Sequence, residues 1–305
     1  MTKFNTMKIR KYTTIILLKR LSRMLPNRIY TPKDGELLYH YCSPETMLAL
    51  CSFKKLRFSD LFSMNDFMEV HWGYHIWEMA AGEVFPVVGK KFLDDIDAII
   101  HESGIRVLPL AACLSKSGDV LSQWRAYGDD GRGFAVGFSP SILNNLPVTA
   151  FKVEYDKRTQ IEEVKSFILA LHTVESQTEA QRGPDFFDAC ATLACDLAAF
   201  KNPAFQEEQE VRLLHLLQFK SSNSSLKLID PAASDGSSQE VKFRMKGCTP
   251  VAYLDMEFSG TSEGHSIVEL IMGPKNDSLL SGISVFLETL GHPNVKVRKS
   301  AASYR

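Results

Sequence analysis

The chain has 305 residues, of which 45% are hydrophobic and 23% are charged, as in an ordinary soluble globular protein. This length accommodates one large domain or two small ones, and either size buries a substantial core. The formal net charge of −1 argues against the global basic signature of a nucleic-acid-binding protein.

The charge is unevenly distributed. Residues 1–30 contain eight lysines and arginines and no acid, whereas residues 31–305 contain 27 basic and 36 acidic residues. We therefore divide the chain into a basic N-terminal arm, residues 1–30, and a single α+β domain, residues 31–305. Such an arm suits contact with a nucleic acid, a membrane surface or an acidic partner, and it equally suits docking on its own body.

The cysteines and the apolar segments indicate a cytoplasmic protein. The six cysteines form no Cys-x-x-Cys pair, which suits a reducing compartment. The apolar stretch Ile15–Leu18 is too short to span a bilayer, and the N-terminus lacks the features of a signal peptide. We expect no membrane span.

The predicted elements mix strands and helices without regular alternation. In chain order, the pattern predicts a basic helix (12–25), a strand (36–41), a helix opened by Ser43-Pro44, a strand (54–59), two helices (66–80 and 90–103), a strand (106–115), a short helix capped by Asp119, two strands (134–138 and 148–155), a helical stretch (158–201) broken at Gly183-Pro184, a strand (211–217), a loop (221–238), three strands (near 241–245, 250–256 and 266–272), a helix (277–290) and a short strand (294–298). This order predicts an α+β fold rather than a doubly wound sheet.

An acidic cluster precedes the strand at 211–217. It consists of Glu207, Glu208 and Glu210. If the strand begins here, its two-residue period places Glu208 and Glu210 on one face. Two adjacent carboxylates repel each other, so we expect one of them to keep its proton toward neutral pH. The simpler interpretation is a solvated acidic turn.

A possible metal site lies in the predicted helix at 66–80. His71, His75 and Glu78 fall on one helical face, a spacing that suits a metal-dependent hydrolase. The pattern lacks the glutamate of the His-Glu-x-x-His motif, and neighbouring tryptophans favour a packed amphipathic helix. We therefore predict no metal ligand, and the hydrolase is the weakest alternative.

Two aromatic motifs are candidates for nucleotide binding. In a strand, His40 of Tyr39-His40-Tyr41 points away from both tyrosines, and it can donate to a ribose or phosphate oxygen. A core histidine with satisfied hydrogen bonds is the ordinary alternative. The second motif, Trp124-Arg125-Ala126-Tyr127, precedes a glycine-rich turn at 128–133, where the backbone can approach a phosphate. A hairpin-like loop explains this turn equally well.

Several short motifs occur in a fixed order between residues 36 and 280. They are Leu38-Tyr-His-Tyr41, Leu56-Arg-Phe-Ser59 with Asn65-Asp66-x-x-Glu69, Ala112-Cys-Leu-Ser115, Gln123-Trp-Arg-Ala-Tyr127 with Gly133, Val153-Glu-Tyr155, Glu208-Gln-Glu-Val-Arg212 and Ile271-Met-Gly-Pro-Lys275. In this order they resemble a large bacterial family named only as a domain of unknown function (family twenty-nine seventy-one). The family name implies no activity.

A looser resemblance concerns the ADP-ribosyltransferase superfamily. A histidine in an early strand, an aromatic residue after a helix and Glu-x-Glu at the start of a later strand are similar to its arrangement. Bacterial members often act as toxins or in defence against phage, on proteins or on nucleic acids. The resemblance implies a mixed or antiparallel split sheet with flanking helices and NAD as co-substrate. The Ser-Thr-Ser strand of the superfamily is absent, and Leu56-Arg-Phe-Ser59 is at best a partial substitute.

The same resemblance assigns roles to residues. Glu210 is expected to stabilise the positive charge that develops on the ribose, and Glu208 to orient or deprotonate the acceptor nucleophile. Arg212 is alternatively the structural partner of both carboxylates. The expected NAD-binding residues are His40, Tyr41, Arg57, Ser59, Trp124 and Tyr127. Among these, His40 holds the adenosine-side ribose, Arg57 meets the pyrophosphate, and Tyr127 or Trp124 stacks on nicotinamide.

The acceptor is not specified by these motifs. It is a protein, an RNA or a DNA, and an antitoxin or regulatory protein is a further expected partner. The main alternative function is a non-catalytic module that senses a nucleotide in the same cleft.

Overall fold

The computed structural model describes residues 28–63, 67–178, 181–222, 225–233, 239–259 and 266–304. The predicted helix at 12–25 and most of the basic arm lie outside these residues. The last three residues of the arm pack against the body: Arg28 forms ion pairs with Glu154 and Glu163, and Tyr30 is buried in the core. A truncation that removes the arm should therefore end before Arg28.

Most of the described strands and helices lie close to their predicted positions, but the predicted loop at 221–238 contains β7, and the predicted helix at 66–80 continues to Val88. The strands are β1 (Leu38–Cys42), β2 (Lys55–Asp60), β3 (Val107–Ser115), β4 (Phe134–Phe138), β5 (Thr149–Lys152), β6 (Glu210–Ser222), β7 (Ser225–Ile229), β8 (Lys242–Lys246), β9 (Thr249–Glu257), β10 (Ile267–Met272) and β11 (Lys296–Lys299). The helices are α2 (Pro44–Phe53), α3 (Phe67–Val88), α4 (Lys90–Arg106), α5 (Leu121–Ala126), α6 (Lys157–Ser176), α7 (Pro184–Asp196) and α8 (Leu280–Thr289).

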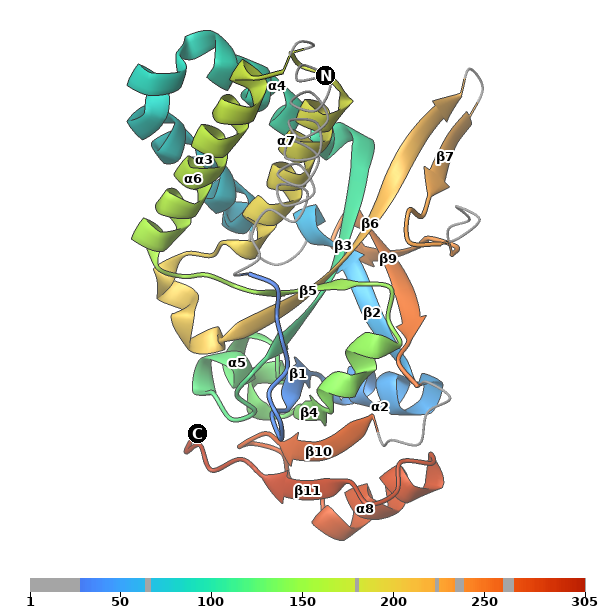
Figure 1. Ribbon diagram of the computed structural model, residues 1–305. Helices are drawn as coiled ribbons and strands as arrows, with labels where there is room; N and C mark the ends of the chain where they lie inside the picture. Colours follow the sequence, from blue (N-terminus) through green and yellow to red (C-terminus); the bar gives the residue numbers. More distant parts are fainter. Residues whose placement is uncertain are drawn as a thin grey trace, which may run out of the picture.

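The strands form one open, mixed sheet, which confirms the α+β prediction (Figure 1). The main path runs in the order β11-β10-β4-β1-β3-β2-β9-β8, and β5, β6 and β7 branch from β3. The pair β10–β11 is parallel, whereas the other strand pairs of the described residues are antiparallel. Strand β8 lies at one end of this path and is therefore an edge strand.

The centre of the sheet divides at β3. Strand β6 pairs along the whole length of β3, from Val107 to Ser115. The opposite edge of β3 is shared: β1 pairs at Ser115, whereas β2 pairs at Leu110 and Ala111. Because β1 and β2 take different ends of this edge, they diverge from each other, and the residues of β3 between them face an opening.

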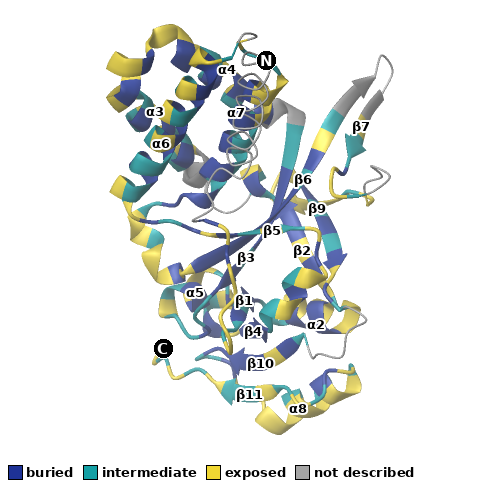
Figure 2. Cartoon of the chain, viewed as in Figure 1, coloured by how far each residue is buried: buried dark blue, intermediate teal, exposed yellow. Residues whose placement is uncertain are grey.

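Two hydrophobic cores hold the arrangement. One lies between the sheet and the helices α2 and α8, where Leu38, Phe58 and Leu213 are fully buried. The other lies among α3, α4, α6 and α7, which form a helical layer at one end of the sheet (Figure 1). Figure 2 shows buried residues on the inner faces of these helices and exposed residues on their outer faces. None of the helices described is long and apolar enough to cross a membrane.

Candidate functional site

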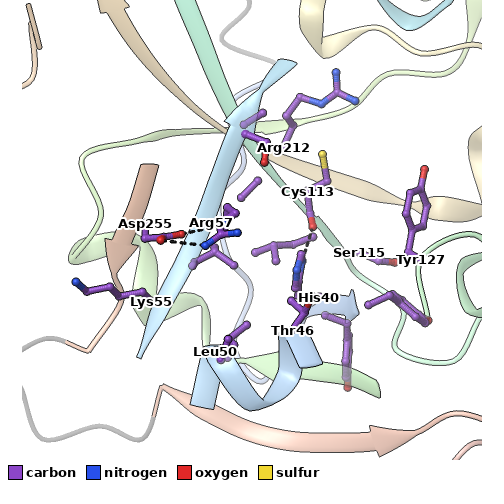
Figure 3. A pocket seen from close by; sticks show the side chains of 18 of the residues that line it. His40, Thr46, Leu50, Lys55, Arg57, Cys113, Ser115, Tyr127, Arg212 and Asp255 are labelled. Atoms are coloured by element: carbon purple, nitrogen blue, oxygen red, sulfur yellow. Dashed lines mark hydrogen bonds and ion pairs between the residues drawn. The ribbon is translucent and has the colours of Figure 1, made fainter. Parts of the chain in front are cut away.

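A cleft of about 680 Å³ opens where β1 and β2 part. Its lining comes from β1, α2, β2, β3, the end of α5, the segment from Lys201 to the start of β6, the edge strand β8 and its neighbour β9. In Figure 3, Arg57 and Asp255 lie on one wall, Tyr127 lies on the opposite wall, and His40 and Cys113 lie between them. The cleft contains seven of the eight residues predicted for the site, namely Glu208, Glu210, His40, Tyr41, Arg57, Ser59 and Tyr127.

The two carboxylates reach the cleft by a sharp turn rather than by a common strand. Glu208 is the last residue of a 3-10 helix, Pro203–Glu208, and β6 begins at Glu210. Between them, Gln209 adopts left-handed backbone angles, φ 45° and ψ 47°. The predicted two-residue strand geometry is therefore wrong for Glu208, although the turn still brings both carboxylates to one place. The third glutamate, Glu207, is exposed, as the solvated-turn interpretation expects.

Both carboxylates are neutralised by buried cations. The Lys201 ammonium lies 2.5 Å from Glu208 Oε2 and 3.2 Å from Glu210 Oε2. The Arg212 guanidinium donates to both oxygens of Glu210, at 2.7 and 3.1 Å. All four side chains are nearly buried, with exposed fractions of 2–7%. Two positive and two negative charges therefore balance at the floor of the cleft. Arg212 contacts Glu210, one of the two carboxylates for which it was the alternative structural partner, whereas Lys201 contacts both.

This arrangement keeps Glu210 ionised. Burial raises the pKa of Glu210, but the attraction of Arg212 and Lys201 outweighs it and lowers the pKa to about 2. The expectation that repulsion keeps a proton on one carboxylate is therefore wrong for Glu210. The reason is that Lys201 and Arg212 both contact this carboxylate directly and offset its repulsion from Glu208.

Residues of the recurrent motifs hold the turn that carries the carboxylates. Ser115 Oγ donates to the backbone carbonyl of Glu208 at 2.7 Å. The backbone N–H of Glu210 donates to the Tyr155 hydroxyl at 2.9 Å, and the N–H of Val153 donates to the Glu210 carbonyl at 3.1 Å. These bonds join motifs that are far apart in the chain and fix one short segment in one place.

His40 bridges the opening between β1 and β3. Its Nδ1 lies 3.2 Å from the carbonyl oxygen of Cys113, and burial lowers the pKa of the imidazole. A carbonyl only accepts hydrogen bonds, so the neutral ring carries its proton on Nδ1 and presents Nε2 as an acceptor. The sequence predicted a donor to a ribose or phosphate oxygen. The observed geometry instead suits acceptance of a hydroxyl proton at Nε2.

Arg57 forms part of the cleft wall with β9. Its guanidinium donates to both oxygens of Asp255, at 2.7 and 3.1 Å, and it lies 3.8 Å above the centre of the Tyr253 ring. Two of its five N–H groups are therefore engaged by a carboxylate. Ser59 lies deeper in the same strand and is buried between β3 and β9.

Of the three predicted aromatic residues, Tyr127 and Tyr41 line the cleft, and Trp124 does not. The Tyr127 hydroxyl lies 3.4 Å from Glu208 Oε1, so this half-buried ring stands beside the carboxylates. Trp124 is 0% exposed and packs edge-on against Tyr41. Tyr41 is itself buried, and its hydroxyl bonds the backbone at Ser117 and Val120. Both rings are therefore structural, and the prediction that Trp124 stacks on a ligand is corrected.

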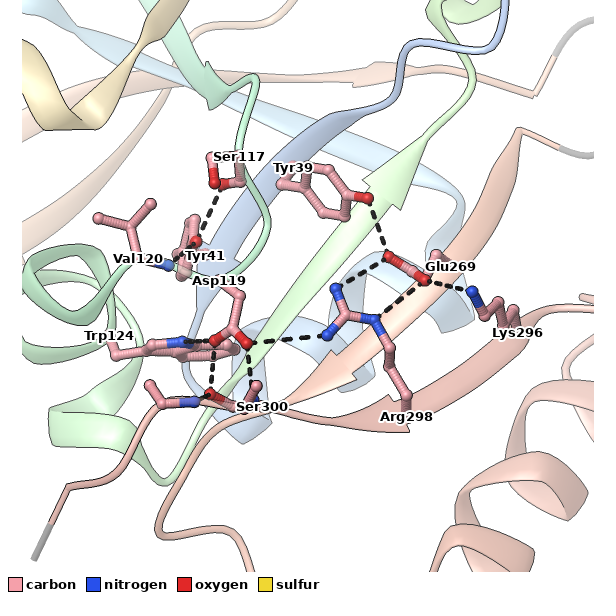
Figure 4. Close-up of polar contacts among 12 residues, drawn as sticks. Tyr39, Tyr41, Ser117, Asp119, Val120, Trp124, Glu269, Lys296, Arg298 and Ser300 are labelled. Carbon is pink, nitrogen blue, oxygen red and sulfur yellow. Dashed lines mark hydrogen bonds and ion pairs between the residues drawn. The ribbon is translucent and has the colours of Figure 1, made fainter.

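A polar cluster fastens the C-terminal residues to the segment that carries Tyr127 (Figure 4). Asp119 accepts hydrogen bonds from the Trp124 indole at 2.8 Å, from Ser300 Oγ at 2.5 Å and from the Ala301 N–H at 2.7 Å. Burial raises the pKa of Asp119, but these bonds outweigh it and lower the pKa. The predicted cap is wrong, because Asp119 is engaged here and the N-cap of α5 is Val120.

The glycine-rich turn packs against protein rather than presenting its backbone to the cleft. A Cβ at Gly133 would lie 2.1 Å from the carbonyl oxygen of Cys42, so only glycine fits there. Gly131 has φ 85° and would place a Cβ against Tyr304 and Pro274. The turn contains a 3-10 helix, Asp129–Gly131, and connects α5 to β4, so the hairpin-like interpretation is wrong as well.

The predicted helical metal pattern lies outside the cleft. His75 and Glu78 on α3 are 49% and 59% exposed and lie 3.8 Å apart. Within the described part of the chain, no group of three or more His, Cys, Asp or Glu side chains is placed to hold a metal ion.

Sequence reasoning missed Lys201, the cation between the two carboxylates. Its neighbours carried a usable signal: Asn202 accepts from the Ala204 N–H as an N-cap, and Pro203 occupies the first helical position. That signal predicts a helical turn leading to Glu208. It does not predict that Lys201 turns inward, because this depends on the position of β3 and β6.

Comparison with known proteins identifies a similarity to one family and indicates no activity. Residues 123–213 match the model of a family described as a protein of unknown function, DUF2971. This match confirms the family resemblance for these residues. The DUF2971 segment contains Tyr127, Lys201, Glu208, Glu210 and Arg212, so it includes the whole buried charge cluster. Neither the curated proteins nor the solved structures contain a match to the chain.

Proposed function

We propose that the cleft binds NAD and that the protein is an ADP-ribosyltransferase acting on a macromolecule. The observation that carries this proposal is a carboxylate, Glu210, held by Arg212 and Lys201 at the floor of a cleft that also contains His40 and Tyr127. The divergence of β1 and β2 at β3 supports it, because the expected fold has a split sheet at its nucleotide site.

Glu210 supplies the electrostatic part of the chemistry. Breaking the bond between ribose C1′ and the nicotinamide nitrogen leaves the electron pair on nicotinamide and develops positive charge on the ribose. A fixed anion at this position stabilises that charge without reorganising during the reaction. Because the pKa of Glu210 is about 2, the carboxylate is ionised at every physiological pH. The acceptor nucleophile then forms the new bond to C1′, and Glu208 takes its proton.

The remaining lining residues fit the other parts of the co-substrate. His40 Nε2 accepts a hydrogen bond from a ribose hydroxyl, since Nδ1 is occupied by Cys113. Tyr127 offers an aromatic face beside Glu208 for nicotinamide. Arg57 contributes positive charge toward the pyrophosphate through the N–H groups not engaged by Asp255. The biological role that this activity supports is a toxin or an anti-phage defence effector with an antitoxin or regulatory partner.

A second candidate function is a nucleotide-sensing module without catalysis. The observation that favours it is the complete engagement of Glu210, whose two oxygens already accept from Arg212 and Lys201. In such a module the carboxylates hold the floor of the cleft together, and the ligand binds above them.

The two functions are separated by measuring nicotinamide release and NAD binding on the same proteins. We expect the wild type to release nicotinamide from NAD. Glu210→Gln should release nicotinamide at least about a hundredfold more slowly, while calorimetry shows that it still binds NAD. Glu207→Gln, an exposed neighbour, is the matched control and should behave as wild type. Glu208→Gln should lower transfer to an acceptor more than it lowers nicotinamide release.

Two results would contradict the enzymatic proposal. One is binding of NAD without nicotinamide release under any condition, which supports the sensing module. The other is absence of NAD binding by a folded wild type. Thermal melting of each variant keeps loss of folding separate from loss of chemistry, because Glu210 is also a partner of Arg212.

A further inference from the structure

One wall of the cleft is strongly basic. It consists of Lys55 and Arg57 on β2 and of Lys242, Arg244 and Lys246 on β8, and we name these five residues the cationic wall. In the whole lining, seven basic residues face four acidic ones, whereas the full chain carries a net charge of −1. The positive charge is thus concentrated at the cleft and is not a property of the chain as a whole.

The excess charge sits on the outer wall and not at the floor. Lys201 and Arg212 are balanced by Glu208 and Glu210, so the floor is neutral. On the cationic wall, by contrast, Asp255 is the one acidic side chain among the lining residues of β2, β8 and β9. The wall therefore carries more positive charge than a single compact co-substrate with two phosphates needs.

The geometry of β8 indicates an extended ligand. All five residues of β8 are exposed, and its cations alternate with Phe243 and Met245. Alternate residues of a strand lie about 7 Å apart on one face, so the three cations form a straight row. All three cations line the cleft, and because β8 is the edge of the sheet, no further strand of the described residues pairs with its outer side.

We propose that the acceptor is a single-stranded nucleic acid whose backbone runs along the cationic wall into the cleft; this inference rests on the proposed transferase function. A single strand offers one negative charge per nucleotide, which matches a row of regularly spaced cations. Its bases can stack on planar side chains nearby: Arg57 lies over the Tyr253 ring, and Phe53 on α2 is 69% exposed. An acidic protein is the competing partner, but it lacks bases for these planar groups.

Binding is tested directly, without NAD, on the full chain. The probe is a fluorescein-labelled 12-nucleotide single strand, as DNA and as RNA, titrated at several salt concentrations. Wild type should bind with a negative slope of log affinity against log salt. Lys242→Gln/Arg244→Gln/Lys246→Gln should make that slope shallower by about 2, at about 0.7 for each phosphate that is no longer neutralised. The single variant Lys55→Gln should change the slope by about 0.7, in case the triple variant folds poorly.

A matched triple variant in the helical layer controls for overall charge and for the basic arm. Lys90→Gln/Lys91→Gln/Arg158→Gln removes three exposed cations far from the cleft and should bind as wild type. The inference is overturned if both triple variants bind alike, if wild type does not bind, or if poly-glutamate competes better than an unlabelled single strand. Nicotinamide release is measured separately, so failure of binding here leaves the transferase proposal standing. If the strand binds but wild type releases no nicotinamide, the transferase proposal fails, and the role of the bound strand as acceptor fails with it.

Discussion

Replacement of Lys201 tests the carboxylate site most sharply. Lys201 is 2% exposed, and its ammonium contacts Glu208 and Glu210 at 2.5 and 3.2 Å. Lys201→Met keeps an unbranched side chain and removes only the charge. The cluster then holds two carboxylates and a single cation, Arg212, in a buried place.

The expected loss of stability is large. For two unit charges 3.2 Å apart, Coulomb's law at an effective dielectric constant of about 20 gives about 5 kcal/mol. The desolvation cost of a buried ammonium, which methionine avoids, offsets part of this energy. Removing one partner of a buried ion pair generally destabilises by about 3–5 kcal/mol. We therefore expect the free energy of unfolding at pH 7 to fall by about 3 kcal/mol or more.

Urea denaturation followed by tryptophan fluorescence measures this change. A double variant, Lys201→Met/Glu208→Gln, removes one charge of each sign and leaves the Glu210–Arg212 pair intact. This double variant should recover more than half of the free energy of unfolding lost in Lys201→Met, because the remaining charges balance again and the effects of residues in contact are not additive. Lys90→Met is the control: its ammonium is 75% exposed, so the change should be under about 1 kcal/mol.

Two outcomes would refute the reasoning. If Lys201→Met loses no more stability than Lys90→Met, the ammonium does not neutralise the carboxylates. If the double variant is less stable than Lys201→Met, Glu208 contributes through something other than its charge.

Three further predictions concern other charged groups. The pKa of Glu210 falls from 4.5 to about 2 on folding, so the ionised carboxylate stabilises the fold fully above pH 4.5, and this stabilisation is lost as pH falls toward 2. In acid titrations of unfolding, wild type should therefore lose stability across this window more steeply than Glu210→Gln, and parallel curves would contradict this. Burial, with repulsion from Glu163, raises the pKa of Asp196 from 3.8 to about 7, so ionisation of Asp196 destabilises the fold as pH rises. Asp196→Asn should therefore have a larger free energy of unfolding than wild type at pH 8, by up to about 4 kcal/mol. This difference should vanish near pH 4. Asp119→Asn weakens the bonds to Ser300 and Trp124 and should lower the urea midpoint by an amount equivalent to about 1–3 kcal/mol, whereas Asp94→Asn on an exposed helix face should not.

Local sequence determined most of the element types. Strand β4 occupies the predicted residues 134–138, the helical stretch breaks at Gly183-Pro184, and Ser43 caps α2 by accepting from the Thr46 N–H. These features depend on periodicity, on proline and glycine, and on a cap two or three residues away. Strand β7 was missed because Ser225–Ile229 follows a polar, serine-rich segment and extends only by pairing with β6.

The sequence also indicated which residues belong together at the site, since seven of the eight predicted ones line one cleft. It did not determine how they are used. Trp124 is packed inside, the His40 ring presents an acceptor, and Glu210 is ionised rather than protonated. The packing of Trp124 against Tyr41 and the bond from His40 to Cys113 join segments distant in the chain. The ionisation of Glu210 depends on Arg212 and Lys201, which are near in the chain but are brought to the carboxylate by the turn before β6.

Tertiary structure alone decided the electrostatics of the cleft. Lys201 enters between the carboxylates because the turn before β6 is fastened to β3 by Ser115 and to the segment after β5 by Tyr155. Strand β8 brings its cations to the same cleft because it pairs with β9 at the edge of the sheet. Sequence patterns report the preferences of neighbouring residues, whereas charge balance depends on distances of a few ångströms that only strand pairing sets.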